Sequence, residues 1–174
     1  YKLMEAVYEV FWENYPDMET IVQRSGMTEE ERETFLAEFE HPHSGGLAAF
    51  CVMGGIFGEG IDLTNDRLIG VIVVGTGLPQ INSEREILKK YYDRTEGNGF
   101  DYAFRCPGIN KVLQAAGRVI RTGSDRGIIL LLDERFLQPD YALLYPREWK
   151  TRQVCTLSDV EAKIRQFWEQ NPEL

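Results

Sequence analysis

The sequence Gln114-Ala-Ala-Gly-Arg-Val-Ile-Arg121 is followed closely by the apolar run Gly127-Ile-Ile-Leu-Leu-Leu-Asp133. If the octet is helical, its polar and glycine positions share one face, because they are spaced i, i+3, i+4 and i+7: Gln114, Gly117, Arg118 and Arg121. Two guanidinium groups and an amide on one face suit a polyphosphate, because arginine offers charge and paired hydrogen bonds together. A solvated helix face with surface ion pairs is the alternative. The octet and the sequence before it favour phosphate recognition.

A second informative segment is rich in glycine and reads Gly54-Gly-Ile-Phe-Gly-Glu-Gly-Ile-Asp62. It follows an apolar strand predicted over residues 47–53. Glycines let the backbone turn sharply and let a ligand approach the amide groups closely. The alternative is a simple glycine turn.

The octet resembles motif VI (Q-x-x-G-R-x-x-R) of superfamily 2 helicases, and the glycine-rich segment resembles their motif V. The pairing of these two motifs is similar to that of DinG/XPD-type DNA helicases. The residues that follow the octet add to this similarity: Asp125, Gly127, Asp133 and Arg135. The resemblance runs from the first residues to about Phe136 and implies the second RecA-like motor domain of such an enzyme. It also implies that Asp133 and Arg135 form a structural corner after motif VI.

The resemblance implies an ATP site shared between two domains. ATP and Mg²⁺ would be bound mainly by a P-loop domain of the same polypeptide, because this sequence has no G-x-x-x-x-G-K-[ST]. Arg118 and Arg121 would be the catalytic arginine fingers that stabilise charge on the transferring phosphoryl group. Four further residues would support the nucleotide site or its motifs: Gln114, Gly117, Glu59 and Asp62. Backbone groups around Gly58 and Gly60 would lie near single-stranded DNA or the interdomain cleft.

Strands and helices alternate along the sequence, which predicts an α/β fold. Strands are expected at residues 20–23, 47–53, 68–74 and 128–132. Helices are expected at 3–15, after a capping box at Thr28 and Glu31, at 83–92, from Pro107 to Arg121, and at 158–170 with Ser158 as cap. Strand 68–74 is branched and apolar without alternation, so it is predicted to be buried on both faces. We expect one RecA-like domain over residues 1–174, with a mostly parallel sheet covered by helices on both faces.

The 174 residues carry a net charge of −9, which excludes a general basic surface for nucleic acid. Residues 1–40 hold 11 acids and 3 bases, a net charge of −8, and the remainder holds 17 acids and 16 bases, a net charge of −1. A single strand would therefore be held locally. The predicted surface consists of the motif V loop, the loop Gly75–Pro79 and the helix with Arg85 and Lys89.

Residues with metal-binding potential give no supported site. Cys51, Cys106 and Cys155 are widely separated and are predicted to be buried, reduced thiols. His41 and His43 have no evident third ligand, so loop histidines without a metal are expected. The resemblance allows an iron–sulfur cluster in the parent protein, but in its first motor domain and not in this chain.

Three further expectations concern the whole protein. No apolar run is long enough to span a bilayer and no signal peptide is visible, so we expect no membrane partner and a cytoplasmic location. The sequence opens at Tyr1 without an initiator Met, and we interpret it as a fragment of a larger protein. The alternative to a motor domain is a RecA-like binding or scaffold domain without motor work. A P-loop domain upstream in the same reading frame would decide between the two.

Overall fold

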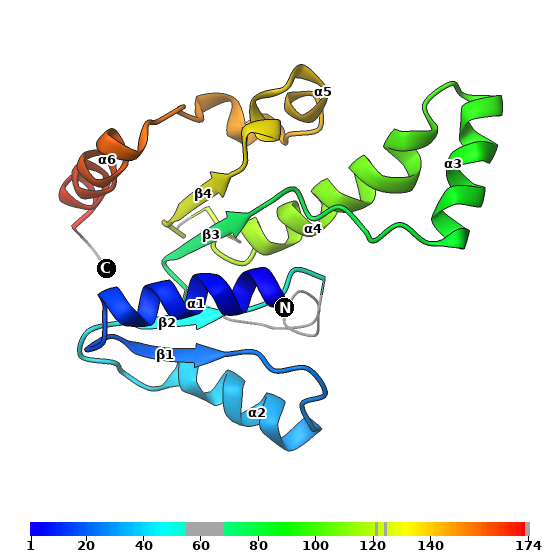
Figure 1. The fold of residues 1–174 in the computed structure, drawn as a ribbon. Coiled ribbons are helices and arrows are strands. Elements are labelled where there is room, and N and C mark those ends of the chain that lie inside the picture. The colour runs from blue at the N-terminus through cyan, green and yellow to red at the C-terminus, as the bar shows by residue number, and fades with distance from the viewer. Residues whose placement is uncertain (55–67, 121, 124, 173–174) are drawn as a thin grey trace.

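The computed structural model describes residues 1–54, 68–120, 122–123 and 125–172. Helices and strands alternate along the chain, as the sequence predicts (Figure 1). The α-helices are α1 (Lys2–Asn14), α2 (Glu29–Ala37), α3 (Ser83–Thr95), α4 (Cys106–Ala116), α5 (Pro139–Ala142) and α6 (Leu157–Gln170). The strands are β1 (Glu19–Val22), β2 (Leu47–Phe50), β3 (Gly70–Val74) and β4 (Ile128–Leu132). A π-helical turn, η4 (Asp101–Arg105), leads directly into α4.

The described strands form two parallel pairs. In the first, residues 19–22 of β1 lie opposite residues 47–50 of β2. In the second, residues 70–74 of β3 lie opposite residues 128–132 of β4. Parallel partners need a crossover connection, which α2 supplies for the first pair and α3 with α4 supplies for the second. The predicted α/β arrangement with parallel strands is therefore present.

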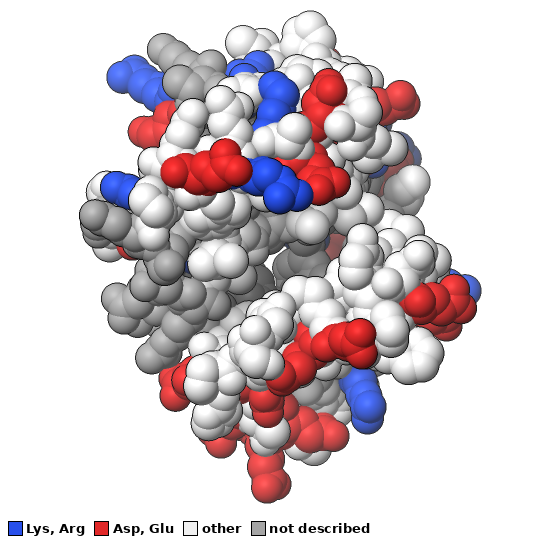
Figure 2. Space-filling view, turned by 90° about the vertical axis from the view of Figure 1, so that its left-hand side faces the viewer, with Lys and Arg blue, Asp and Glu red and all other residues white. Residues whose placement is uncertain are grey.

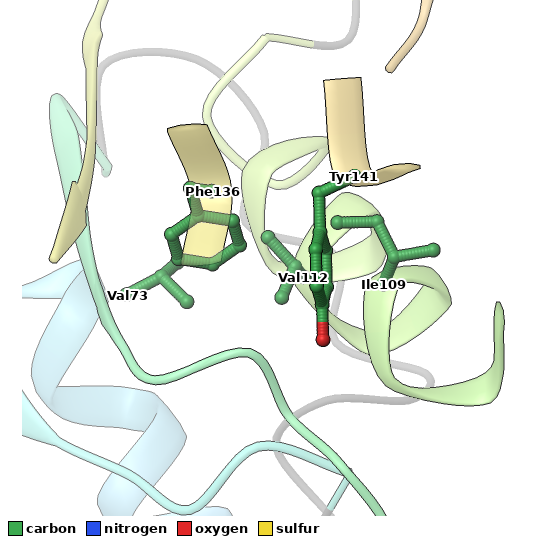
Figure 3. Close-up of a cluster of buried hydrophobic side chains, with 5 residues drawn as sticks. All are labelled: Val73, Ile109, Val112, Phe136 and Tyr141. Atoms are coloured by element: carbon green, nitrogen blue, oxygen red, sulfur yellow. The ribbon is translucent and has the colours of Figure 1, made fainter. Parts of the chain in front are cut away.

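The main hydrophobic core lies between β3, α4 and the segment after β4. Its buried members are Val73, Ile109, Val112, Phe136 and Tyr141 (Figure 3). Ile109 and Val112 are one turn apart on α4, and their exposed fractions are 2% and 0%. Burying an aliphatic side chain of this size stabilises the fold by about 1.5–3 kcal/mol. The Tyr145 hydroxyl donates a hydrogen bond of 2.6 Å to the Phe136 carbonyl, so the segment after β4 closes this core.

The N-terminal elements pack separately on the β1–β2 pair. The rings of Tyr8 and Phe11 on α1 each contact the Phe50 ring of β2, with centroid distances of 5.3 Å. The predicted capping box of α2 is confirmed: Glu31 N–H donates to Thr28 Oγ1 at 3.2 Å, and Thr28 N–H donates to Glu31 Oε2 at 2.7 Å. Figure 2 shows acidic side chains gathered on the lower part of the molecule, where these elements lie.

The prediction that strand 68–74 is buried on both faces is wrong for the described residues. Val73 is 2% exposed and faces the core, whereas Ile72 is 62% exposed and Val74 is 38% exposed. Successive side chains of a strand point to opposite faces, so one face of β3 is covered and the other is open. The apolar composition of residues 68–74 shows only that other segments could pack on both faces of this strand. Burial also requires segments that pack on each face, and the described residues pack on one face of β3.

Two smaller predictions also need correction. Helix α6 begins at Leu157 after Thr156, so Ser158 lies inside its first turn and is not the cap. The Thr156 hydroxyl donates instead to the Asp159 carboxylate at 2.6 Å. Of the cysteines, Cys51 and Cys155 are exposed and Cys106 is partly exposed, so the prediction of buried thiols is wrong. All three are free thiols in the structure.

Candidate functional site

Helix α4 contains the beginning of the Gln114–Arg121 octet but does not continue through it. The helix ends at Ala116, with Gly117 as its C-terminal cap at φ −66°. The N–H groups of residues 118 and 119 then bond to the carbonyls three residues back, each at 3.1 Å. The prediction of a helix reaching residue 121, with the octet on one helical face, is therefore wrong. Gln114 lies exposed on the helix, and Arg118 lies half-buried in the turn that follows.

The packing of Val119 explains where the helix stops. This side chain is 4% exposed. It lies so close to Gly127 that a Cβ atom at that glycine would collide with Val119 Cγ1. Ile128 N–H, next in the chain, donates to the Ile69 carbonyl at 3.0 Å. Burial of Val119 at the start of the β3–β4 pair holds the chain in a turn, whereas the residue spacing shows only that a helix is allowed.

A second turn follows the arginine segment. The N–H and hydroxyl groups of Thr122 donate to the two carboxylate oxygens of Asp125, at 2.8 and 2.7 Å. Arg121 itself lies outside the described residues. Buried Val119 and the Thr122–Asp125 turn are the described features on either side of Arg121 in the sequence.

The start of the motif V segment lies beside α4. Met53 packs against the core cluster. Gly54 adopts φ +72°, and a Cβ atom there would lie 2.8 Å from Lys111 Cε. Lys111 stands one turn before Gln114 on the same helix, so Gly54 lies beside the helix in which motif VI begins. Sequence reasoning missed Lys111, although its i−3 spacing from Gln114 was a signal that could have found it. The four predicted motif V residues lie outside the described residues: Gly58, Glu59, Gly60 and Asp62.

The loop after β3 touches the first turn of α4 through backbone atoms. Gly77 adopts φ +67°, and a Cβ atom there would lie 2.8 Å from the Gly108 carbonyl oxygen. A Cβ atom at Gly108 would lie 2.7 Å from the Thr76 carbonyl oxygen. Both positions therefore require glycine, one for its backbone angle and both for the close approach. Thr76 is 1% exposed, and its hydroxyl has no hydrogen-bond partner among the described residues.

The predicted DNA-contacting cations of α3 lie within a helical hairpin formed by α3 and η4. Arg85 Nη1 donates to the Ala103 carbonyl at 3.1 Å, which joins α3 to η4. Lys89 Nζ lies 2.8 Å from Asp93 Oδ2. This hydrogen bond raises the pKa of Lys89 and lowers the pKa of Asp93. Arg85 joins α3 to η4, whereas Lys89 is paired within α3. The role of both cations in DNA binding stays a prediction.

The corner predicted after motif VI is present at the end of β4. Asp133 Oδ1 accepts from the N–H and Nε of Arg135, each at 2.9 Å, and Oδ2 accepts from Nη2 at 2.7 Å. The bond to the Arg135 side chain is the main reason that the pKa of Asp133 lies below its ordinary value. This pair fixes the chain where it leaves the sheet.

The described residues form neither a metal site nor a membrane span. Within the described ranges, no group of three or more His, Cys, Asp or Glu side chains is arranged to hold a metal ion. Among the same residues, no helix is long and apolar enough to cross a membrane.

Comparison with known proteins identifies the family. The sequence matches the family described as "Helicase C-terminal domain" over residues 1–152. A "Regulator of telomere elongation helicase 1 homolog" of Culex quinquefasciatus is 34% identical over 144 residues, which cover 77% of this chain and 15% of the relative. The "ATP-dependent DNA helicase DinG" of Photobacterium profundum is 30% identical over 115 residues, which cover 65% of this chain and 16% of that protein.

Solved structures agree on the fold. The structure named "XPD_APO" superposes with a TM-score of 0.63 at 22% identity, and covers 82% of this chain and 28% of that chain. The structure named "XPD_Helicase" gives a TM-score of 0.56 at 22% identity, with 78% and 25% covered. The predicted α/β RecA-like fold is confirmed by this likeness. The chain spans less than a fifth of the length of the curated relatives it matches, 18% of the Caenorhabditis briggsae relative among them. The chain belongs to the helicase C-terminal domain family and is of the DinG/XPD type.

Proposed function

We propose that this chain is the second motor domain of an ATP-dependent DNA helicase. It completes an ATP site together with a P-loop domain of the same polypeptide, and it contacts single-stranded DNA. The observation that carries the proposal is that the first residue of the motif V segment lies beside α4, the helix in which motif VI begins. Gly54, where motif V begins, lies beside Lys111, and the turn with Arg118 follows the same helix.

The arginines of this chain act on charge that moves during hydrolysis. ATP supplies the phosphoryl group, and the other domain holds most of the nucleotide and Mg²⁺. The guanidinium groups of Arg118 and Arg121 donate hydrogen bonds to phosphoryl oxygens and offset their charge. Arginine fingers contribute roughly 10³–10⁵ in rate, or about 4–7 kcal/mol of barrier. A surface ion pair contributes only about 0–1 kcal/mol. The size of the effect therefore separates arginine fingers from arginines that form only surface ion pairs.

An iron–sulfur cluster does not fit the described residues. Clusters are held by four cysteine thiolates, and this chain has three cysteines in distant parts of the sequence. No group of metal-binding side chains forms among the described residues. If the complete protein carries such a cluster, other parts of the polypeptide must bind it.

The proposal is tested by replacing each arginine in the complete polypeptide. Arg121→Ala and Arg118→Ala should each reduce ATPase stimulated by single-stranded DNA by about a thousandfold or more. Single-strand affinity and melting temperature should stay close to wild type. The matched control is Arg165→Ala, because Arg165 is an exposed arginine on α6 with one surface ion pair, at 3.0 Å from Glu161. Retention of most ATPase in both variants would favour a scaffold domain without motor work.

A second test uses the isolated chain. Residues 1–174 should hydrolyse no ATP and should bind it weakly, because the sequence lacks a P-loop. Submicromolar affinity for ATP by calorimetry would contradict the shared-site proposal.

A further inference from the structure

Helix α3 presents a cationic and aromatic face that the structural contacts of the hairpin do not use. The residues spaced i, i+3, i+4 and i+7 on it are Ile87, Lys90, Tyr91 and Arg94, and all are exposed. Ile87 is 68% exposed and Tyr91 is 59% exposed. Neither Lys90 nor Arg94 forms an ion pair with any residue that the structure describes. We call these four residues the α3 stripe.

The Tyr91 ring packs against another aromatic ring, which in turn stacks on a third. Its ring meets the Tyr92 ring edge to face, at a centroid distance of 5.2 Å and an angle of 83°. The Tyr92 ring stacks on the Tyr102 ring of η4, at 4.2 Å and 15°. Such ring pairs stabilise each other beyond the area that they bury. Tyr91 is therefore an exposed aromatic ring that is held in place by its contact with Tyr92.

The hairpin beneath the α3 stripe is closely packed. Asp93 Oδ1 accepts from Gly99 N–H at 2.9 Å. A Cβ atom at Gly99 would collide with the Lys89 carbonyl oxygen, so the turn after α3 lies directly against the helix backbone. Asp93 is thus bonded both to Lys89 and to this turn. Its charge is partly neutralised, which leaves Glu84, one turn before Ile87, and Glu86, one turn before Lys90, as the acids beside the α3 stripe on the same helix.

These features fit one class of ligand. Proteins hold single-stranded nucleic acid by stacking bases on aromatic rings and by placing cations along the phosphate backbone. Tyr91 offers the ring, Lys90 and Arg94 offer cations one residue before and three residues after it, and Ile87 extends the apolar surface. A protein helix is a poorer partner for this surface, because the α3 stripe has only one exposed aliphatic residue and two cations.

We propose that Tyr91 is a stacking site for a base of single-stranded nucleic acid, with Lys90 and Arg94 bound to the adjoining phosphates. The inference rests on the proposed function and names a part of its strand-binding surface. It moves the contact from Arg85, which bonds to η4, and Lys89, which is paired with Asp93, to the opposite side of the same helix.

The test measures binding of a fluorescently labelled oligothymidylate to the complete polypeptide by anisotropy at several salt concentrations. Tyr91→Ala should weaken binding by about fivefold to a hundredfold, and Tyr91→Phe should bind like wild type, because it keeps the ring. The control is Tyr15→Ala, because Tyr15 is also 59% exposed and directly follows α1, in another part of the fold. Lys90→Gln and Arg94→Gln should each lower the slope of log affinity against log salt by about 0.7.

A second readout reports contact directly. Irradiation with an oligonucleotide that contains 5-iodouracil, followed by trypsin, should attach the nucleotide to the peptide of residues 91–94. Equal affinity of Tyr91→Ala and wild type, or crosslinks only elsewhere, would overturn the stacking site and leave the motor function standing. If wild type binds no oligothymidylate, the DNA contact of the proposed function fails and the stacking site fails with it.

Discussion

Val52 N–H donates a hydrogen bond of 2.8 Å to Oε1 of Gln23, a side chain that is 2% exposed. Gln23 Nε2 in turn donates to the Tyr1 hydroxyl at 3.3 Å. One buried amide therefore connects the end of β1, the N-terminus and the segment that leads from β2 to motif V. The position of that segment depends on a polar group in the interior.

Replacing this amide should cost stability. Gln23→Leu keeps a similar volume but leaves Val52 N–H without its partner, so the free energy of unfolding should fall by about 1–3 kcal/mol. Urea denaturation followed by circular dichroism measures the change. Gln166→Leu, at an exposed position of α6, is the matched control and should change stability by less than about 0.5 kcal/mol. Equal stability of the two variants would show that the amide is not needed.

The contact between Gly77 and Gly108 can be separated from backbone strain, because Gly75 in the same loop also has a positive φ. Gly75 has φ +83° with nothing within 4 Å of the position that a Cβ atom would take, whereas Gly77 has φ +67° and the Gly108 carbonyl oxygen at 2.8 Å from that position. Gly75→Ala should cost roughly 1–2 kcal/mol through its backbone angle. Gly77→Ala should cost a further ~1–3 kcal/mol through overpacking. Thermal unfolding of the two variants provides the comparison, and equal losses would contradict the close approach.

The ring of His43 predicts a pH dependence of stability. Nδ1 lies 2.6 Å from Glu19 Oε2 and Nε2 lies 2.8 Å from the Glu38 carbonyl oxygen. Both partners are acceptors, so both bonds form only with the protonated ring. The bond to Glu38 and then the bond to Glu19 raise the pKa of His43 above its ordinary value. The stabilisation is fully present below the unfolded pKa of about 6.5 and is lost as pH rises through the folded pKa.

The urea midpoint should therefore fall as the pH rises from about 6.5 to the alkaline side of the folded pKa. His43→Gln should remove this part of the pH dependence. His41→Gln, at an exposed neighbouring histidine, should leave it unchanged. A wild-type profile identical to that of His43→Gln would show that the bridge does not form in solution.

Arg105 joins η4 to α5 and should not tolerate lysine. Its guanidinium bonds to Asp101 at 2.6 Å and to Asp140 at 3.1 Å, and its side chain is 16% exposed. It also lies over the rings of Phe100 and Tyr141, at 5.5 and 5.4 Å from their centroids. A lysine keeps the charge but loses the planar fork that makes these contacts together. Arg105→Lys should destabilise the domain by about 1–2 kcal/mol in urea, whereas Arg147→Lys, at an exposed site, should be neutral. Tolerance of lysine at residue 105 would mean that charge alone matters there.

The sequence predicted features that depend on local chemistry. The capping box at Thr28 and Glu31 and the strands β3 and β4 follow from neighbouring residues, and all are present. The Asp133–Arg135 corner was implied by the family resemblance and is also present. The family was also visible, because its two motifs are short and specific.

Features that depend on distant packing were not predictable in the same way. The octet has helical spacing, and only the burial of Val119 against Gly127 shows why the helix ends at Ala116. Gln23 looks like a surface residue in the sequence, because polar side chains are mostly exposed. Its burial becomes visible only when Val52 is brought beside it. Arg85 similarly looks like a free cation until its partner, the Ala103 carbonyl of η4, is placed.

The glycine contact between the β3 loop and α4 has a mechanical consequence. Side chains between two elements can change rotamer and let one element slide along the other, but Gly77 and Gly108 place backbone directly on backbone. No side chain of either glycine lies between them to rearrange. We therefore expect α4 and the loop after β3 to move together as one rigid unit when either is displaced.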